Sequence, residues 1–78
     1  MNNNRSDLNN KICLRIKFER IKRHLSQEQL AEIADLNRNT IGNIERGLAS
    51  PTIDTLEKLA KVFEMSVIDL MNVDNITL

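Results

Sequence analysis

The chain has 78 residues, of which 41% are hydrophobic and 28% are charged, and its 11 Lys and Arg side chains balance 11 Asp and Glu. This length fits one small globular domain and argues against most enzymes. One cysteine, Cys13, and one histidine, His24, cannot supply four metal ligands or an intramolecular disulfide, so we expect no metal and no other cofactor. Oligomerisation remains as a way to bury more surface, and we expect a dimer.

The sequence contains no candidate membrane segment. Its longest unbroken apolar run covers residues 12–14, far fewer than the roughly 20 residues that cross a bilayer. Residues 1–5 lack the apolar core of a signal peptide. We therefore expect a cytoplasmic protein in which Cys13 is a reduced, partly buried thiol.

The charges are distributed unevenly along the chain. Residues 1–46 carry nine basic and six acidic side chains, whereas residues 47–78 carry two basic and five acidic ones. This asymmetry favours a basic side that approaches an anionic partner and an acidic side that faces away from it. Ordinary solvated charge gives a similar pattern, so the distribution alone decides nothing.

The spacing of apolar residues, at intervals of three and four, predicts an all-α fold of five short helices. Two glycines and one proline leave little material for a turn-rich β fold. Residues 1–8 are polar and Asn-rich, and we expect them to form a flexible arm. The first helix is predicted from Asn9 to Arg23, with His24 ending it in the left-handed conformation.

The second and third helices are delimited by capping residues. Ser26 followed by Gln29 forms a capping box, which predicts a helix over residues 27–34. After a short turn, Asn37 is a strong N-cap and Gly47 is a typical C-terminal stop, so a helix is predicted over residues 38–46.

Two further helices are predicted before a short tail. Thr52 caps a fourth helix and Ser66 with Asp69 caps a fifth, which ends at Met71. The C-terminal tail, residues 72–78, is more apolar than a free end needs. The domain proper is therefore predicted over residues 9–71. The fourth helix carries an apolar stripe of Ile53, Leu56, Leu59, Ala60 and Phe63.

The second and third helices satisfy the requirements of a helix-turn-helix. Counting from Gln27, the fifth place needs a small residue where the two helices touch, and Ala31 stands there. The ninth place, in the turn, needs a positive φ, and Asp35 adopts that conformation more readily than most residues. The inner faces need apolar side chains, which are Leu30, Ala34, Leu36, Ile41 and Ile44.

Three stretches occur in order and at consistent spacing: LSQEQLA over residues 25–31, NTIGNIERG over residues 39–47 and SPTIDTL over residues 50–56. With them, the sequence resembles the Xre-type helix-turn-helix family, which includes lambdoid phage repressors, Cro proteins and the controller proteins of restriction-modification systems. The resemblance covers about residues 12–71. It implies a compact repressor-like domain whose third helix enters the major groove of DNA.

The resemblance also implies which side chains read bases. With Ile41 and Ile44 turned inward, the outward residues of the third helix remain for DNA. We expect Arg38 and Asn39 to read bases, because Arg can bind guanine O6 and N7 while Asn can bind adenine N6 and N7. Weaker candidates for contacts with bases or phosphates are Thr40 and Asn43. Gly42 has no side chain, which lets the helix approach the groove closely.

Other residues are expected to hold the DNA backbone or the helix. Gln27, beside the free amides at the start of the second helix, is a candidate phosphate contact, with Arg46 and Ser50 on the other side. Arg20 and Glu45 match an ion pair that, in similar repressors, ties the first helix to the third. The alternatives are a solvated helix start at Arg38 and Asn39, and two exposed charges at Arg20 and Glu45.

The first helix carries a second apolar stripe, Leu14, Phe18 and Ile21, on nearly the opposite side from Ile12 and Ile16. Either the tail folds back onto the second stripe through Ile76 and Leu78, or another protein binds it. The dimer interface expected from the resemblance lies around the fifth helix, at Val67, Leu70 and Met71, with Phe18 as second choice.

The sequence therefore predicts a dimeric, sequence-specific regulator of transcription, a repressor or controller-type protein, with no enzymatic step. Two copies would place their recognition helices about 34 Å apart and select an inverted repeat in double-stranded DNA. Glu57 and Glu64 are candidate contacts for RNA polymerase, although ordinary surface charge is the simpler interpretation. The alternative is an antitoxin or anti-regulator that binds a partner protein through the stripe containing Phe18.

Overall fold

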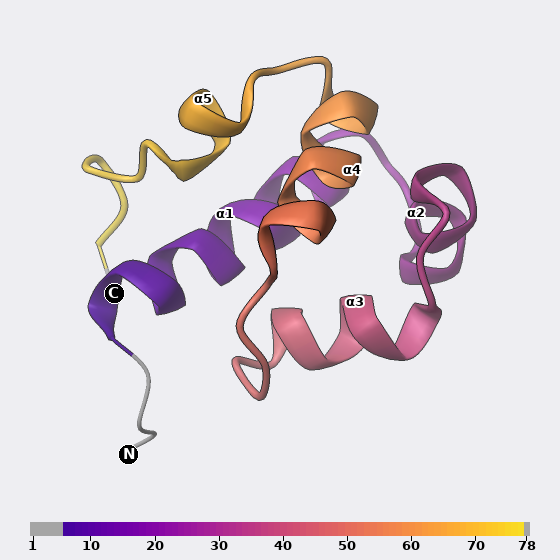
Figure 1. The fold of residues 1–78 in the computed structure, drawn as a ribbon, viewed down its shortest axis with the longest axis horizontal. Coiled ribbons are helices and arrows are strands. Elements are labelled where there is room, and N and C mark those ends of the chain that lie inside the picture. Colours follow the sequence, from indigo (N-terminus) through magenta and orange to yellow (C-terminus); the bar gives the residue numbers. More distant parts are fainter. Residues whose placement is uncertain (1–5, 78) are drawn as a thin grey trace.

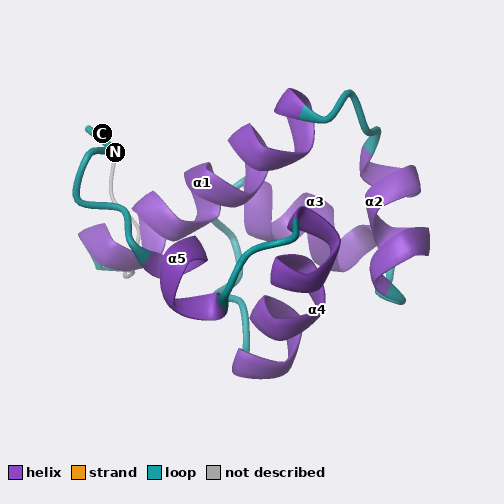
Figure 2. Cartoon of the chain, turned by 90° about the horizontal axis from the view of Figure 1, so that it is seen from above, coloured by secondary structure: helices purple, strands orange, loops and turns teal. Residues whose placement is uncertain are grey.

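The computed structural model describes residues 6–77, which form five helices and no strand, as the sequence predicts. The core is formed by the inner faces of all five helices, and α4 contacts both α2 and α5. Figures 1 and 2 show α2 and α5 at opposite ends of the molecule. The helices are α1 (Asp7–Lys22), α2 (Gln27–Ala34), α3 (Arg38–Glu45), α4 (Ile53–Phe63) and α5 (Val67–Met71).

Helix α1 begins two residues earlier than predicted. The Ser6 hydroxyl accepts a hydrogen bond from the Asn9 amide at 3.1 Å, so Ser6 is an N-cap that the sequence analysis missed. The helix ends at Lys22, and His24 has a φ of 58°, the left-handed conformation predicted for it. The part of the predicted arm that covers residues 1–5 lies outside the described residues.

The helix-turn-helix has the predicted boundaries at α2 and at the start of α3. Ser26 and Gln29 form both bonds of the capping box, and the Asn37 side chain accepts from the Asn39 amide at 2.7 Å. Asp35 has a φ of 57°, so it adopts the left-handed turn that the ninth place requires. Helix α3 ends at Glu45, one residue earlier than predicted.

The predicted inward positions form the core. Leu30, Ala31, Ala34, Ile41 and Ile44 are each at most 5% exposed, and Leu36 packs against them in a partly buried position. Burying such side chains is the main stabilising contribution to a domain of this size. Cys13, expected to be partly buried, is fully buried.

The prediction that Ile53 belongs to the buried apolar stripe of α4 is wrong. Its side chain is 61% exposed, because Ile53 is the first residue of α4 and lies at the edge of the core. The other four residues of the stripe are buried. The tail does fold back in part, since Val73 is buried and Ile76 packs against the core; Leu78 lies outside the described residues.

The chain from residue 6 to residue 77 contains no helix that is both long and apolar enough to cross a membrane. The same residues contain no group of three or more His, Cys, Asp and Glu side chains that could hold a metal ion.

Candidate nucleic-acid interface

The outer face of α3 begins with two exposed polar side chains, Arg38 and Asn39. Neither side chain makes a hydrogen bond to any residue between 6 and 77, whereas the backbone at this point is held by the Asn37 cap. Helix α3 lies along one edge of the molecule, with its long outer side uncovered (Figure 1). Thr40, one residue further along, is partly buried.

The ion pair between Arg20 and Glu45 is present and ties α1 to α3. The two groups meet through two hydrogen bonds, Nε to Oε2 at 2.7 Å and Nη2 to Oε1 at 2.8 Å. The Glu45 side chain is only 3% exposed, so the alternative of two exposed charges is wrong. The hydrogen bond to Glu45 raises the pKa of Arg20, although burial opposes that shift. A paired, planar contact of this kind fixes the angle of α3.

Gln27 joins this ion pair from the first turn of α2. Its side-chain amide donates to Oε1 of Glu45 at 3.1 Å. One of the two N–H groups of the amide is therefore used inside the protein, and the other makes no hydrogen bond to residues 6–77. Gln27, the candidate phosphate contact, is thus hydrogen-bonded to the ion pair that orients α3.

The sequence predicted an outward-facing Gly42, but in the structure Gly42 is buried. A Cβ atom there would lie 3.7 Å from Oε1 of Gln27 and 3.8 Å from Nη1 of Arg46, because both side chains fold over the glycine. Arg46 also donates from Nη2 to Oδ1 of Asn43 at 2.7 Å. Two candidate DNA contacts are therefore paired with each other, whereas Ser50 is exposed in the loop before α4.

The predicted dimer residues do not share one surface. Leu70 is fully buried in the core, so its side chain is unavailable to a partner, and that assignment is wrong. Val67 and Met71 are partly buried, and Phe18 is 48% exposed. The sequence analysis missed Ile68, which is 81% exposed. Val67 and Ile68 are adjacent in one short helix, so their side chains point in different directions. Two adjacent apolar residues were therefore the signal in the sequence that one of them is exposed.

A second buried carboxylate, Glu19, was not predicted. Its side chain is 4% exposed and is surrounded by Arg15 at 2.7 Å, Arg23 at 2.6 Å and Lys22 at 3.4 Å. Burial of the Glu19 carboxyl raises its pKa, but the hydrogen bonds from Arg23 and Arg15 and the nearby positive charges outweigh burial. Together they lower the pKa from 4.5 to about 2. The spacing of four residues on each side of Glu19 was the signal in the sequence.

The two arginines around Glu19 also cap other helices. Arg23 donates to the Phe63 carbonyl at the end of α4 at 2.7 Å, and its guanidinium lies 4.8 Å from the centre of the Phe63 ring. Arg15 donates to the carbonyls of Asp69 and Asn72, at the end of α5. The Phe63 carbonyl lies in the last turn of α4, where carbonyls lack a partner within the helix. The Asp69 carbonyl already accepts from the Asn72 amide at 3.1 Å, and Arg15 is its second donor.

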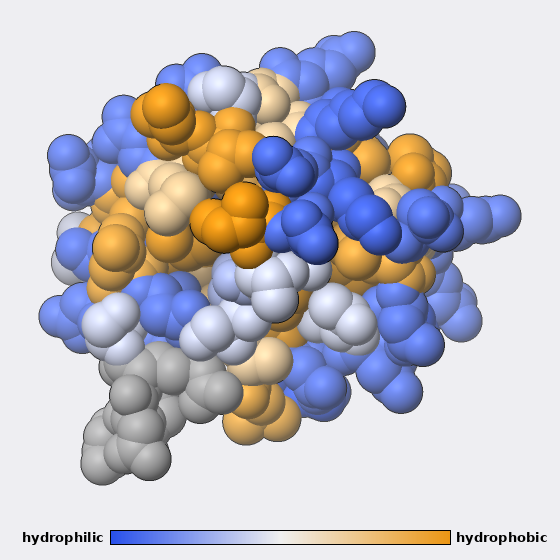
Figure 3. Space-filling model, viewed as in Figure 1, coloured by the Kyte–Doolittle hydropathy of each residue, from blue (hydrophilic) through white to orange (hydrophobic). Residues whose placement is uncertain are grey.

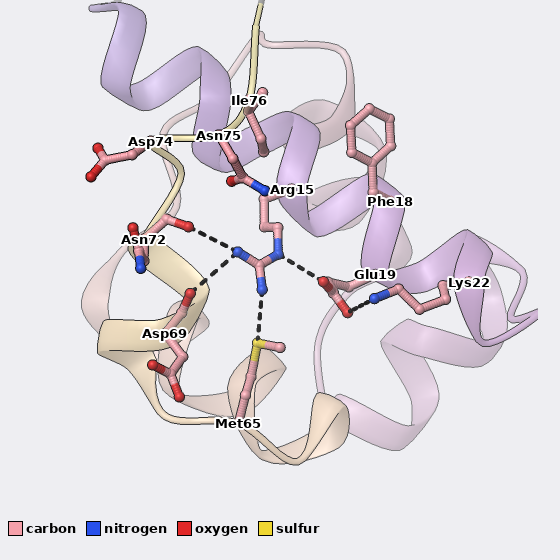
Figure 4. A pocket seen from close by; sticks show the side chains of 10 residues that line it. All are labelled: Arg15, Phe18, Glu19, Lys22, Met65, Asp69, Asn72, Asp74, Asn75 and Ile76. Atoms are coloured by element: carbon pink, nitrogen blue, oxygen red, sulfur yellow. Dashed lines mark hydrogen bonds and ion pairs between the residues drawn. The ribbon is translucent and has the colours of Figure 1, made fainter.

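Arg15 lies at the floor of a groove between α1, α5 and the tail (Figure 4). Phe18 of the second apolar stripe and Ile76 of the tail both line this groove. Phe18 and Ile21 remain 48% and 50% exposed, respectively.

The capped helix pair, the buried inner positions and the outward polar face together define a helix-turn-helix domain. The model of the helix-turn-helix family matches residues 16–70, and the chain belongs to this family, as the Xre-type resemblance predicted. It is 50% identical over 48 residues to the control protein C.SmaI of Serratia marcescens, covering 62% of this chain and 57% of that protein.

Two solved structures share the fold. The restriction-modification controller protein C.AhdI from Aeromonas hydrophila aligns with a TM-score of 0.74 and 33% identity, over 82% of this chain and 96% of that one. SinR, solved in complex with DNA, aligns with a TM-score of 0.73 and 37% identity, over 78% of this chain and 98% of that one. Against three of its curated relatives, the chain spans only 52% to 63% of their length.

Proposed function

We propose that the chain is a sequence-specific regulator of transcription that binds double-stranded DNA through α3 and catalyses no reaction. The observation that carries the proposal is the exposed pair Arg38 and Asn39, whose side chains have no partner among residues 6–77. They stand at the start of a helix whose angle is fixed by a buried ion pair. Base-reading groups need free donors and acceptors on a rigid support, and this arrangement supplies both. SinR, a structural neighbour, has been solved bound to DNA.

In this proposal the remaining contacts position the domain. The second N–H of the Gln27 amide and the N-terminus of α2 bind phosphate on one side of α3, and Arg46 and Ser50 bind phosphate on the other. Thr40 lies next to the base readers and makes a flanking contact.

The regulator acts as a homodimer on an inverted repeat, in the cytoplasm. Figure 3 shows apolar side chains on the face of the molecule that carries α5 and α4. Among the residues of these two helices, Ile68 is 81% exposed and Ile53 is 61% exposed. We place the two-fold contact on this surface, with Val67 and Met71 at its edge and Phe18 as the second site. Any contact with RNA polymerase uses the exposed acidic residues of α4, such as Glu57.

Selection of duplexes from a randomised pool by the purified protein, at near-physiological salt, tests the proposal. We expect enrichment of an inverted repeat with half-sites about one helical turn apart. Retention of DNA without enrichment of any sequence would show nonspecific phosphate binding and would contradict sequence-specific regulation.

A second candidate function is binding of a partner protein, as an antitoxin or anti-regulator. The observation that favours it is the half-exposed pair Phe18 and Ile21 on α1, away from α3. Failure to retain any duplex, together with a small protein that copurifies with the wild-type chain and is lost from Phe18→Ser, would favour this function over the first.

A further inference from the structure

A lysine in the second half of α1, Lys17, takes no part in the contacts described above. Its side chain is partly buried, so part of its aliphatic stem packs on the protein, as long charged side chains commonly do. Its ammonium group forms no ion pair and no hydrogen bond with residues 6–77. Four other cations of α1 and its C-cap each pair with a buried carboxylate: Arg15, Arg20, Lys22 and Arg23.

Two contacts of α1, one on each side of Lys17, place this lysine beside the end of α3. One turn before Lys17, Sγ of Cys13 lies 3.8 Å from the Ala49 carbonyl oxygen. About one turn after it, Arg20 binds Glu45. Residues three and four positions apart lie on the same face of a helix. Lys17 therefore faces the short stretch of chain that joins these two contacts.

This stretch, residues 46–48, leaves its backbone uncovered at Gly47. A Cβ atom at Gly47 would have no atom within 4 Å among the described residues beyond its chain neighbours. Arg46, the phosphate contact proposed above, is exposed on the same stretch. Two cations, Lys17 and Arg46, therefore border one open surface at the end of α3. Positive charges that have no carboxylate partner attract an anion, and the backbone of DNA presents phosphates.

We propose that Lys17 is a further phosphate contact, which holds the DNA backbone against α1 beside the C-terminal end of α3. The inference rests on the proposed function, since it requires α3 to lie in the major groove. The lysine ammonium is a point charge with three N–H donors, so it binds a phosphate oxygen without reading sequence. With Gln27 on α2 and Arg46 after α3, it gives the backbone a contact with a third helix.

The test is the salt dependence of binding to one duplex of fixed, arbitrary sequence. Each phosphate that a protein cation neutralises adds about 0.9 to the slope of log affinity against log salt concentration. We expect Lys17→Met to bind severalfold more weakly at near-physiological salt and to reduce the slope by about 0.9 per subunit. Lys17→Arg keeps the positive charge, and we expect it to keep the slope of wild type.

Lys11 provides the matched control. It is a second partly buried lysine of α1 with no partner among residues 6–77. It stands six residues before Lys17, which places it about 120° away around the helix. Lys11→Met removes the same charge from another face, so we expect less than half the change in slope. Equal changes for the two substitutions would show that overall charge sets the slope, and would overturn the inference.

Neither lysine ammonium has a partner within residues 6–77, so we expect all three variants to keep the melting temperature of wild type. Each slope is measured well below the melting temperature of its variant, so that a change in stability does not enter it. A wild-type slope in Lys17→Met would overturn the inference and leave the proposed function intact, provided that wild type enriches an inverted repeat. Failure of wild type to bind any duplex would overturn both.

Discussion

Two acidic side chains of the described part of the chain are buried in ion pairs with arginines at α1, Glu45 and Glu19, and they serve different purposes. Glu45 comes from α3 and is 3% exposed, with Arg20 of α1 as its charged partner. Glu19 is 4% exposed and takes its partners from nearby in the sequence, Arg15 of α1 and Arg23 at the C-cap of α1. The first pair joins two helices directly, whereas the second gathers two arginines whose remaining N–H groups cap α4 and α5.

This difference separates the half of the domain that contains α3 from the half that contains α5. Loss of the Glu45 pair would leave the angle of α3 relative to α1 unfixed. Loss of Glu19 would remove the carboxylate that holds Arg15 and Arg23 in place against the C-terminal ends of α5 and α4. A buried pair contributes little net stability over an apolar replacement, but breaking it leaves one uncompensated charge. Single substitutions at Arg20 and at Glu19 therefore test the two buried carboxylates separately.

The largest effect is expected from Arg20→Met, which leaves the Glu45 carboxylate buried with only the Gln27 amide. We expect the free energy of unfolding, measured by urea denaturation, to fall by about 3 to 5 kcal/mol. The matched control, Lys61→Met, removes an exposed charge and should change it by less than about 0.5 kcal/mol. Equal effects of the two substitutions would show that the pair is solvated.

A slightly smaller effect is expected when Glu19 is protonated. Its pKa falls from 4.5 to about 2 on folding, so the ionised group stabilises the fold above pH 4.5. This stabilisation, about 3 kcal/mol, is lost as the pH falls toward 2. We expect Glu19→Gln to be less stable than wild type at neutral pH, with the difference in free energy of unfolding narrowing below pH 4.5. A difference that stays constant with pH would contradict the assignment.

Arg38→Ala should affect DNA binding while leaving both buried centres intact. We expect binding to the selected operator to weaken by about 1 to 3 kcal/mol, with little change for random duplex, if Arg38 has the proposed base-reading role. Gln27→Ala should weaken binding to both duplexes, since the role proposed for Gln27 is a phosphate contact, which does not depend on sequence. The dissociation constants of both variants and of wild type, measured by titration with the operator and with random duplex, test this prediction. Equal losses on both duplexes for Arg38→Ala would rule out base reading.

The smallest effect is expected from Gly42→Ala, and it is stabilising. The added methyl group would meet Gln27 and Arg46 at ordinary van der Waals distances, so it has space. Replacing a helical glycine by alanine adds about 0.5 to 1 kcal/mol to stability, which corresponds to a rise of several degrees in melting temperature. A lower melting temperature by calorimetry would show that Gln27 and Arg46 cannot accommodate the methyl group.

The sequence predicted those features that depend on a few neighbouring residues. Ser26, Asn37 and Asp35 each set a helix end or a turn by local bonds, and the structure places all three as expected. The Arg20 to Glu45 pair was also predicted, but only because a family resemblance supplied the long-range pairing.

The features that were missed depend on packing between distant segments. Helix α5 has five residues, too few to show a periodic pattern, so the inward side chain, Leu70, was placed outside and Ile68 was overlooked. Arginines four residues from a glutamate are common on exposed helices. The burial of Glu19 follows only from the approach of α4 and α5. The pairing of Asn43 with Arg46 depends on side-chain rotamers that no spacing rule specifies.

The contact of Arg15 with the end of α5 has a consequence for the order in which the domain opens. A helix of five residues has no stability of its own in water, so α5 persists only while Leu70 stays in the core and Arg15 holds the carbonyls of Asp69 and Asn72. Slow hydrogen exchange of the α5 amides therefore reports on its docking against α1 rather than on helix fraying. The outer surface of α5, where we propose the two-fold contact, therefore exists only in molecules whose α1 is already folded.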